Sequence, residues 1–243
     1  MRLFSAVVPV VVAVLCAGNL SVELEGGLVW QSRNDFRIPN DDTEATEIDL
    51  VALAGSGPLA AGRMYVNWDM NPKHRLQLTL APLEISETVE LEEAAVFQGV
   101  TFPAGTTDAV FRFNSWRVGY SYLFHESESW QWRVGFTAKI RDALISLSQE
   151  DLHAEKTDLG FVPLLYLRGD YTFCPGTKLS LDFNGLAGGP GRAFDVSLKL
   201  SRDLSERLSL NAGYRTIEGG ANVEAVYTFA WLHYAVLGME YRF

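Results

Sequence analysis

Polar and apolar residues alternate along most of the chain. Between residues 20 and 33 the apolar positions are Leu20, Val22, Leu24, Leu28 and Trp30, and the intervening positions include Ser21, Glu23, Glu25, Gln31 and Arg33. Successive side chains of a β-strand point to opposite faces, so this period predicts a strand with one apolar and one polar face. The same pattern recurs in residues 63–70, 75–82, 116–124, 130–141, 158–173, 179–187, 194–200, 208–215 and 227–243. The chain is therefore predicted to be all-β, with about ten strands.

The predicted connections alternate in length along the chain. The short ones are residues 71–74, 125–129, 174–177 and 204–207, and the longer ones are 34–58, 89–107, 149–157, 188–191 and 218–223. Short turns on one side and longer loops on the other are typical of membrane barrels with an even number of antiparallel strands. We therefore predict a closed antiparallel transmembrane β-barrel of about ten strands. Eight or twelve strands remain possible, because residues 47–53 could add strand.

Aromatic residues gather near the predicted strand ends, on the apolar face. Rings at these positions suit the headgroup zones of a bilayer, where Trp and Tyr are enriched. A soluble β-sandwich also alternates, but it would give no reason for this placement. The residues concerned are Trp30, Trp68, Tyr120, Tyr122, Phe124, Trp130, Trp132, Tyr171, Phe173, Phe229, Trp231, Tyr241 and Phe243.

Both ends of the chain carry features of an exported protein. Residues 1–18 place Arg2 before a short apolar stretch and then small residues, which predicts a signal peptide followed by one barrel domain, residues 19–243. The final alternating strand ends in Phe243. This ending resembles the signal that the barrel-assembly machinery reads in bacterial outer-membrane proteins. We therefore expect location in the cell outer membrane, with its lipids and that machinery as partners.

Five stretches of the sequence are similar to a family of uncharacterised outer-membrane barrels of diderm bacteria. They are FNSWRVGY at 113–120, GFTAKIRDA at 135–143, KTDLGFVPLL at 156–165, GRAFDV at 191–196 and VYTFAWLHY at 226–234. The resemblance implies the fold and the compartment. It implies no known activity or ligand, so it supplies no catalytic residues.

Composition narrows the possible partners. The chain has 30 Asp and Glu residues against 20 Lys and Arg, for a formal net charge of −10. Phosphate affinity comes mostly from Lys and Arg, so nucleic acid is not expected as a partner. The two cysteines exclude a disulfide framework, and no His or Cys spacing resembles a metal site. Neither a metal nor a cofactor is expected.

The polar face, predicted to line the lumen, carries nearly balanced charge. Its cations are Arg63, Arg75, Arg117, Arg133, Lys139, Arg141, Arg168, Lys199, Arg215 and Arg242, and its anions are Glu23, Glu25, Asp69, Asp158, Asp170, Asp182, Asp195 and Glu240. A small barrel has little room beyond its own side chains, so most of these charges are expected to pair. A rim network is predicted near the outer strand ends, either supporting the barrel or binding a small anionic or zwitterionic ligand. Its residues are Lys139, Arg141, Asp158, Asp195 and Arg215, with Asp142, Lys156 and Arg192 nearby.

The sequence favours a small non-catalytic barrel that is structural, or a narrow polar conduit, or a ligand-binding barrel. A wide porin is not expected, because water-filled lumens belong to barrels of about 16 strands. The alternative is a hydrolase that modifies lipid or peptide at the outer surface. Its candidate base is His153, in a predicted outer loop with Glu150, Asp151 and Glu155. A soluble lectin-like sandwich is a third class.

Overall fold

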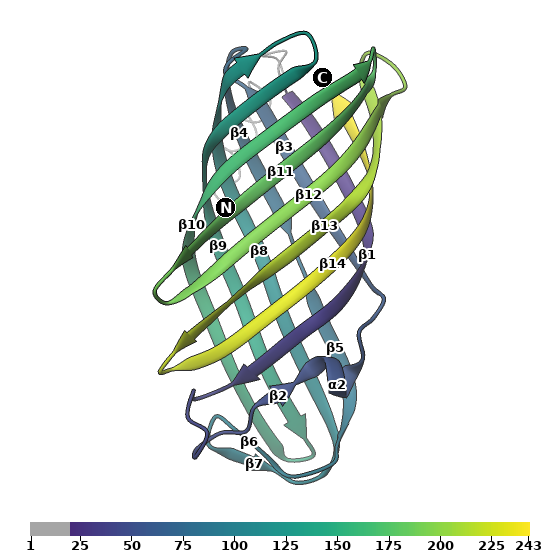
Figure 1. Ribbon diagram of the computed structural model, residues 1–243. Coiled ribbons are helices and arrows are strands. Elements are labelled where there is room, and N and C mark those ends of the chain that lie inside the picture. The colour runs from purple at the N-terminus through teal and green to yellow at the C-terminus, as the bar shows by residue number, and fades with distance from the viewer. Residues whose placement is uncertain (1–19) are drawn as a thin grey trace, which may run out of the picture.

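The protein forms a closed barrel of ten antiparallel strands (Figure 1). The structure is a computed structural model that describes residues 20–243, and the predicted signal peptide lies outside them. The barrel strands are β1 (Leu20–Arg37), β3 (Leu59–Asp69), β4 (His74–Ala81) continued by β5 (Glu84–Leu91), β8 (Gly105–Glu126), β9 (Trp130–Gln149), β10 (Leu152–Cys174), β11 (Thr177–Gly188), β12 (Gly191–Asp203), β13 (Leu208–Val223) and β14 (Val226–Arg242). The predicted fold and strand number are confirmed.

Pairing between the first and last strands closes the barrel. β1 pairs with β14 from Ser21↔Arg242 to Arg37↔Tyr227, and the Phe243 N–H donates to the Leu20 carbonyl oxygen at 3.0 Å. Closure satisfies the backbone groups of both strands and leaves no free sheet edge between them.

One end of the barrel, here called the turn end, carries the four predicted short connections. They are residues 70–73, 127–129, 175–176 and 204–207. Gly176 has φ +75°, a backbone conformation that disfavours other residues, which explains a glycine in the two-residue turn from β10 to β11. The C-terminus lies at this end (Figure 1).

The opposite end, here called the loop end, differs from the prediction. The expected loops 149–157, 188–191 and 218–223 are mostly strand, and the turns between strands contain only residues 150–151, 189–190 and 224–225. β10 continues through the polar stretch after Asp151, because buried and exposed side chains still alternate there: Ala154 is buried, whereas His153 and Glu155 are exposed. The charged residues of segment 149–157 had led to the prediction of a loop, although the alternation of its side chains is that of a strand.

The barrel wall is much higher on one side than on the other. β8, β9 and β10 have 22, 20 and 23 residues, whereas β11 and β12 have 12 and 13. A tilted strand of about 9–11 residues is enough to cross a bilayer. The three long strands therefore project well beyond the β11–β12 hairpin at the loop end (Figure 1).

A cap covers this projection, built from residues 38–58 and 92–104 with the strand tips beneath them. It contains β2 (Ile48–Asp49), α2 (Leu50–Ala54), β6 (Ala95–Phe97) and β7 (Val100–Phe102). The possible extra strand at residues 47–53 is thus a two-residue strand followed by a short helix. Asp49 caps that helix, its Oδ1 accepting the N–H groups of Val51 at 2.9 Å and Ala52 at 3.0 Å.

The cap has a hydrophobic core of its own, and the barrel wall has an apolar outer surface. Phe36, Phe97 and Phe102 are at most 1% exposed in the cap core. On the outside of the barrel, Phe136, Leu165 and Leu237 are 60–70% exposed, whereas charged side chains such as Arg117, Lys199 and Arg215 are buried inside. Within residues 20–243, no helix is both long and apolar enough to cross a membrane.

Candidate functional site

The lumen near the turn end holds a balanced set of charges. Arg75 donates to both carboxylate oxygens of Asp69 at 2.7 and 2.8 Å, and Arg168 pairs with Asp170 at 3.0 Å and Asp182 at 3.5 Å. This turn-end cluster contains four cations and four anions: Arg75, Arg133, Arg168, Lys178, Asp69, Asp170, Asp182 and Glu240. Its charges balance in number: Arg75 and Arg168 pair with carboxylates, whereas Arg133 donates to the backbone carbonyl oxygens of Pro72 and Lys73.

A second cluster lies deeper in the lumen and centres on Asp195 of β12. This carboxylate accepts hydrogen bonds or ion pairs from three guanidinium groups: Arg117 at 2.7 Å, Arg215 at 2.7 Å and Arg63 at 3.1 Å. Asp195 is only 3% exposed. Because a buried charge is costly without partners, the three arginines are what allow a carboxylate at this depth.

Glu25 of β1 extends the same cluster. It contacts Lys199 at 3.1 Å and Arg215 at 3.3 Å, and Lys199 also bonds Glu23 at 2.6 Å. This cluster, here called the central network, therefore links β1, β3, β8, β12 and β13, which lie all around the barrel.

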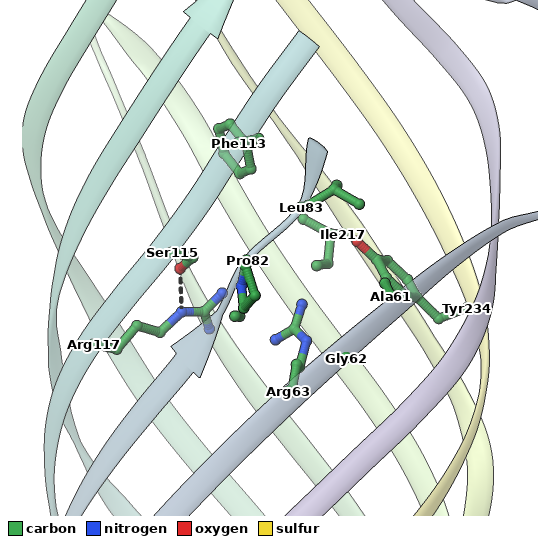
Figure 2. Close-up of a pocket in the computed structure, with 11 residues that line it drawn as sticks. Ala61, Gly62, Arg63, Pro82, Leu83, Phe113, Ser115, Arg117, Ile217 and Tyr234 are labelled. Atoms are coloured by element: carbon green, nitrogen blue, oxygen red, sulfur yellow. Dashed lines mark hydrogen bonds between the residues drawn. The ribbon is translucent and has the colours of Figure 1, made fainter. Parts of the chain in front are cut away.

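These contacts cross the lumen. Arg63 comes from β3 and Arg117 from β8, and each is separated from β12 by three intervening strands along the nearer path around the sheet. Figure 2 shows both guanidinium groups beside Pro82, with the Arg117 Nε donating to the Ser115 Oγ at 2.8 Å. The void between them measures about 10 Å³, roughly the space of one water molecule. Side chains thus fill the barrel at this level.

The link between β4 and β5 adds an apolar side chain to this filling. Pro82 and Leu83 separate the two strands, and Leu83 packs inside the barrel against Tyr234 and Ile217 (Figure 2). Proline lacks the N–H that a continuous ladder would use, which explains the break at this position.

The central network, unlike the turn-end cluster, has an excess of positive charge. Five cations face three anions: Arg63, Arg117, Lys139, Lys199 and Arg215 against Glu23, Glu25 and Asp195. The nearly balanced lumen expected from the sequence is therefore divided into a neutral part and a cationic part.

A chamber of about 650 Å³ lies between the central network and the cap. Asp195, Arg117 and Lys139 form its floor, and Ile38 with Val226 lies on the side of the cap. Its walls are apolar and include Phe111, Phe113, Leu164, Ile217 and Leu232. A volume between about 300 and 1,000 Å³ with apolar walls and a few polar groups is typical of small-molecule sites.

The pairing of barrel strands is interrupted beside the chamber. β10 pairs with β11 only from Leu165↔Gly185 to the turn, so in the described chain residues 152–164 of β10 have no partner on β11. Pro163 lies where this pairing ends. The chamber lining includes Val162 and Leu164 on one side of the gap and Leu186 and Gly188 on the other.

Two cations that line the chamber, Lys139 and Lys156, have no anionic partner among the described residues, and Lys139 is the buried one of the two. It is 3% exposed, and its ammonium lies 4.5 Å from the centre of the Phe113 ring. Among residues 20–243 it forms neither an ion pair nor a side-chain hydrogen bond. Arg141, nearer the gap, pairs with Asp158 of β10. Gly160 leaves room for this pair, since a Cβ there would lie 2.9 Å from the Arg141 Nη2.

The structure divides the predicted rim network. Lys139, Arg141, Asp158 and Asp195 all line the chamber, and Arg215 lies one layer deeper, bonded to Asp195. Lys156 and Arg192 also line it, whereas Asp142 bonds Asn114 at 2.9 Å outside it. The apolar walls of the chamber were not predicted from the sequence. Their only signal was apolar residues on the lumenal parity at the loop end, such as Leu164, Ile217 and Leu232.

His153, the candidate base, lies on β10 and not in a loop. Its Nδ1 is 2.8 Å from the Ser148 Oγ and its Nε2 is 3.7 Å from Glu155, but its side chain is 57% exposed. It lies outside the lining of the chamber. No serine, cysteine or histidine among the described residues lines the chamber, and they contain no group of His, Cys, Asp or Glu that could hold a metal ion.

Comparison with known proteins gives structural neighbours only. No family model and no curated protein matches the sequence, so the resemblance to a family of uncharacterised barrels stays a prediction. The solved outer membrane protease OmpT from Escherichia coli is similar at 9% identity and a TM-score of 0.53, over 93% of this chain and 97% of that one. Neisserial surface protein A shows 12% identity and a TM-score of 0.40, over 92% and 97%. Ail of Yersinia pestis shows 10% and 0.39, over 93% and 99%.

At these identities the likeness concerns the fold alone. The similarity to OmpT extends over nearly the whole of both chains, in agreement with the closed strand order found here. The chain has the fold of a bacterial outer-membrane β-barrel.

Proposed function

We propose that the protein is a non-catalytic barrel of the bacterial outer membrane that is closed to solutes and holds a small ligand in its chamber. The apolar outer wall supports insertion into lipid, because a membrane barrel presents apolar residues outward and polar residues to its lumen. The turn end then faces the periplasm and the cap faces the outside, as is usual for barrels with short periplasmic turns.

The observation that carries the proposal is the chamber of about 650 Å³ above a floor of bridging ion pairs. A conduit needs a continuous path, but Arg63, Arg117 and Asp195 join opposite walls of the lumen. A purely structural barrel gives no reason for a chamber beside an interruption of the strand pairing. A ligand-binding barrel explains both features.

Current recordings test whether the lumen is closed. Purified protein reconstituted into planar lipid bilayers should insert without producing discrete current steps, because side chains fill the central lumen. Insertion must be shown independently, by floating the protein with vesicles of the same lipids. Steady single-channel steps from inserted protein would contradict the closed lumen.

Binding of a neutral apolar fluorophore tests whether the chamber holds a ligand. A naphthylamine dye should brighten with protein in phosphatidylcholine nanodiscs, and Ala193→Trp should abolish most of the signal by filling the chamber. Ala193 lines the chamber on β12. The matched control is Ala212→Trp, on the exposed outer face of β13. Equal brightening with both variants would place the dye in the surrounding lipid and contradict chamber binding.

A further inference from the structure

We propose that the chamber ligand is an anionic amphiphile, an acyl chain with a carboxylate or phosphate head, drawn from the surrounding lipid. This inference rests on the proposed function and names the ligand class of the same chamber. The head lies at Lys139 and Arg141, and the chain lies along the apolar walls.

The charge of the floor selects an anion. The central network has two more cations than anions, and the chamber-facing member without an anionic partner is Lys139. An unpaired buried ammonium is unfavourable, so a ligand carboxylate or phosphate that pairs with it gains the interaction that the protein itself leaves unmade. Arg141 sits on the same face of β9 two residues away and can supply a second donor.

The walls select an apolar chain. Above Lys139 the lining passes to Phe113, Phe111 and Ile145 on one side and to Ile217 and Leu232 on the other. These side chains would be poorly hydrated in an empty chamber and well packed against methylene groups. A small hydrophilic anion would pair with Lys139 at the floor but would make no contact with the apolar walls.

The gap between β10 and β11 lies between this chamber and the outer surface of the barrel. Leu159, Phe161 and Leu165 on β10 are 77%, 65% and 60% exposed, and Leu186 on β11 is 40% exposed. Apolar residues this exposed are matched to lipid and not to water. Because β11 has only 12 residues, the gap near its end lies close to one boundary of the apolar layer, on the side of the cap. Lipid chains reach the gap there.

Competition in nanodiscs tests the ligand class. Protein in phosphatidylcholine nanodiscs is loaded with the neutral naphthylamine dye and titrated with palmitate, lysophosphatidate, hexadecanol or inorganic phosphate. Palmitate or lysophosphatidate should displace the dye at lower concentration than hexadecanol, and inorganic phosphate should not displace it. The two anionic arms show whether a carboxylate or a phosphate head is preferred.

Substitution of Lys139 tests the position of the head. Lys139→Met should weaken the anionic ligand roughly ten- to hundredfold, the usual size of a lost charged hydrogen bond, and leave hexadecanol unchanged. Lys139→Arg keeps the charge and should retain the preference for an anion. The matched control is Lys178→Met, a lumenal lysine in the turn-end cluster, which should not alter binding. Circular dichroism shows that each variant is folded.

The inference is overturned if hexadecanol binds as well as palmitate and lysophosphatidate, if Lys139→Met weakens neutral and anionic ligands alike, or if inorganic phosphate displaces the dye. These results are distinct from failure of the proposed function. If the dye still binds the wild-type protein and this binding is lost in Ala193→Trp, the chamber remains a binding site and only the proposal of an anionic amphiphile is rejected. If the dye binds Ala193→Trp and the wild-type protein equally, the chamber is not its binding site and the proposed function is contradicted.

Discussion

A single carboxylate organises the interior of this barrel at the scale of residues. Asp195 pairs with Arg63, Arg117 and Arg215, which come from three different strands. Parity along β12 places Asp195 in the lumen, and this could be predicted from the sequence. Arg215, on the neighbouring strand β13, was already grouped with Asp195 in the predicted network. Arg63 and Arg117 could not be predicted as partners, because they come from β3 and β8 across the lumen and meet Asp195 only when the sheet closes.

Removing Asp195 should strongly destabilise the protein. Asp195→Ala leaves three buried guanidinium groups without their shared partner, and breaking such a buried pair typically costs about 3–5 kcal/mol. Urea unfolding in one detergent, followed by tryptophan fluorescence, measures the free energy of unfolding.

Asp203 provides the control for Asp195. Asp203 pairs with Arg242 near the turn end, and its side chain is 40% exposed. Asp203→Ala should therefore lower the free energy of unfolding by no more than about 1 kcal/mol. Equal losses from the two variants would show that the central network contributes no more than a surface pair.

At the scale of elements, the long strands and the cap form one unit. Residues 34–58 and 89–107 were predicted to be long loops, but residues 34–37, 89–91 and 105–107 belong to barrel strands. The cap places Ile48, Leu50, Phe97 and Phe102 in a core against the tips of β8, β9 and β10. Short elements of two to five residues have no recognisable period, so only packing reveals them.

Loss of a core side chain should open the cap without unfolding the barrel. Phe102 is 0% exposed, and replacing a core Phe with Ala typically lowers the free energy of unfolding by about 3–5 kcal/mol. Because the cap is a small unit, this loss should make it open locally while the barrel stays folded. Limited proteolysis of membranes should cut residues 92–104 of Phe102→Ala faster than those of wild type, as read by mass spectrometry.

Phe173→Ala is the control for the cap. Phe173 lies on the outer surface near the turn end and is 57% exposed. Its replacement should leave cleavage of residues 92–104 at the rate of wild type. Faster cleavage throughout the barrel strands of Phe102→Ala would contradict a local opening and indicate that cap and barrel unfold together.

At the scale of the whole molecule, the two ends of the barrel differ in kind. The turn end has four short connections and the exposed thiol of Cys174, whereas the loop end carries the cap and the high wall of β8, β9 and β10. This asymmetry predicts one orientation in the membrane, with the turn end in the periplasm.

Labelling of intact cells tests this orientation. A membrane-impermeant maleimide should not modify Cys174 until the outer membrane is permeabilised. In a Cys174→Ser background, Glu93→Cys should react without permeabilisation, because residue 93 is exposed in the cap. Reaction of Cys174 in intact cells, together with protection of Glu93→Cys, would show the reverse orientation.

The sequence by itself determined the number of barrel strands, their inward and outward faces and the short turns, because the two-residue period and the turn residues are local properties of the chain. It did not determine how far the strands continue at the loop end. It also placed Lys139, Arg141, Asp158, Asp195 and Arg215 on the lumenal face. Tertiary structure alone decided which charges meet across the lumen, where β10 separates from β11, and that the cap covers a chamber. These features depend on the stagger and closure of ten strands, which bring together residues far apart in sequence.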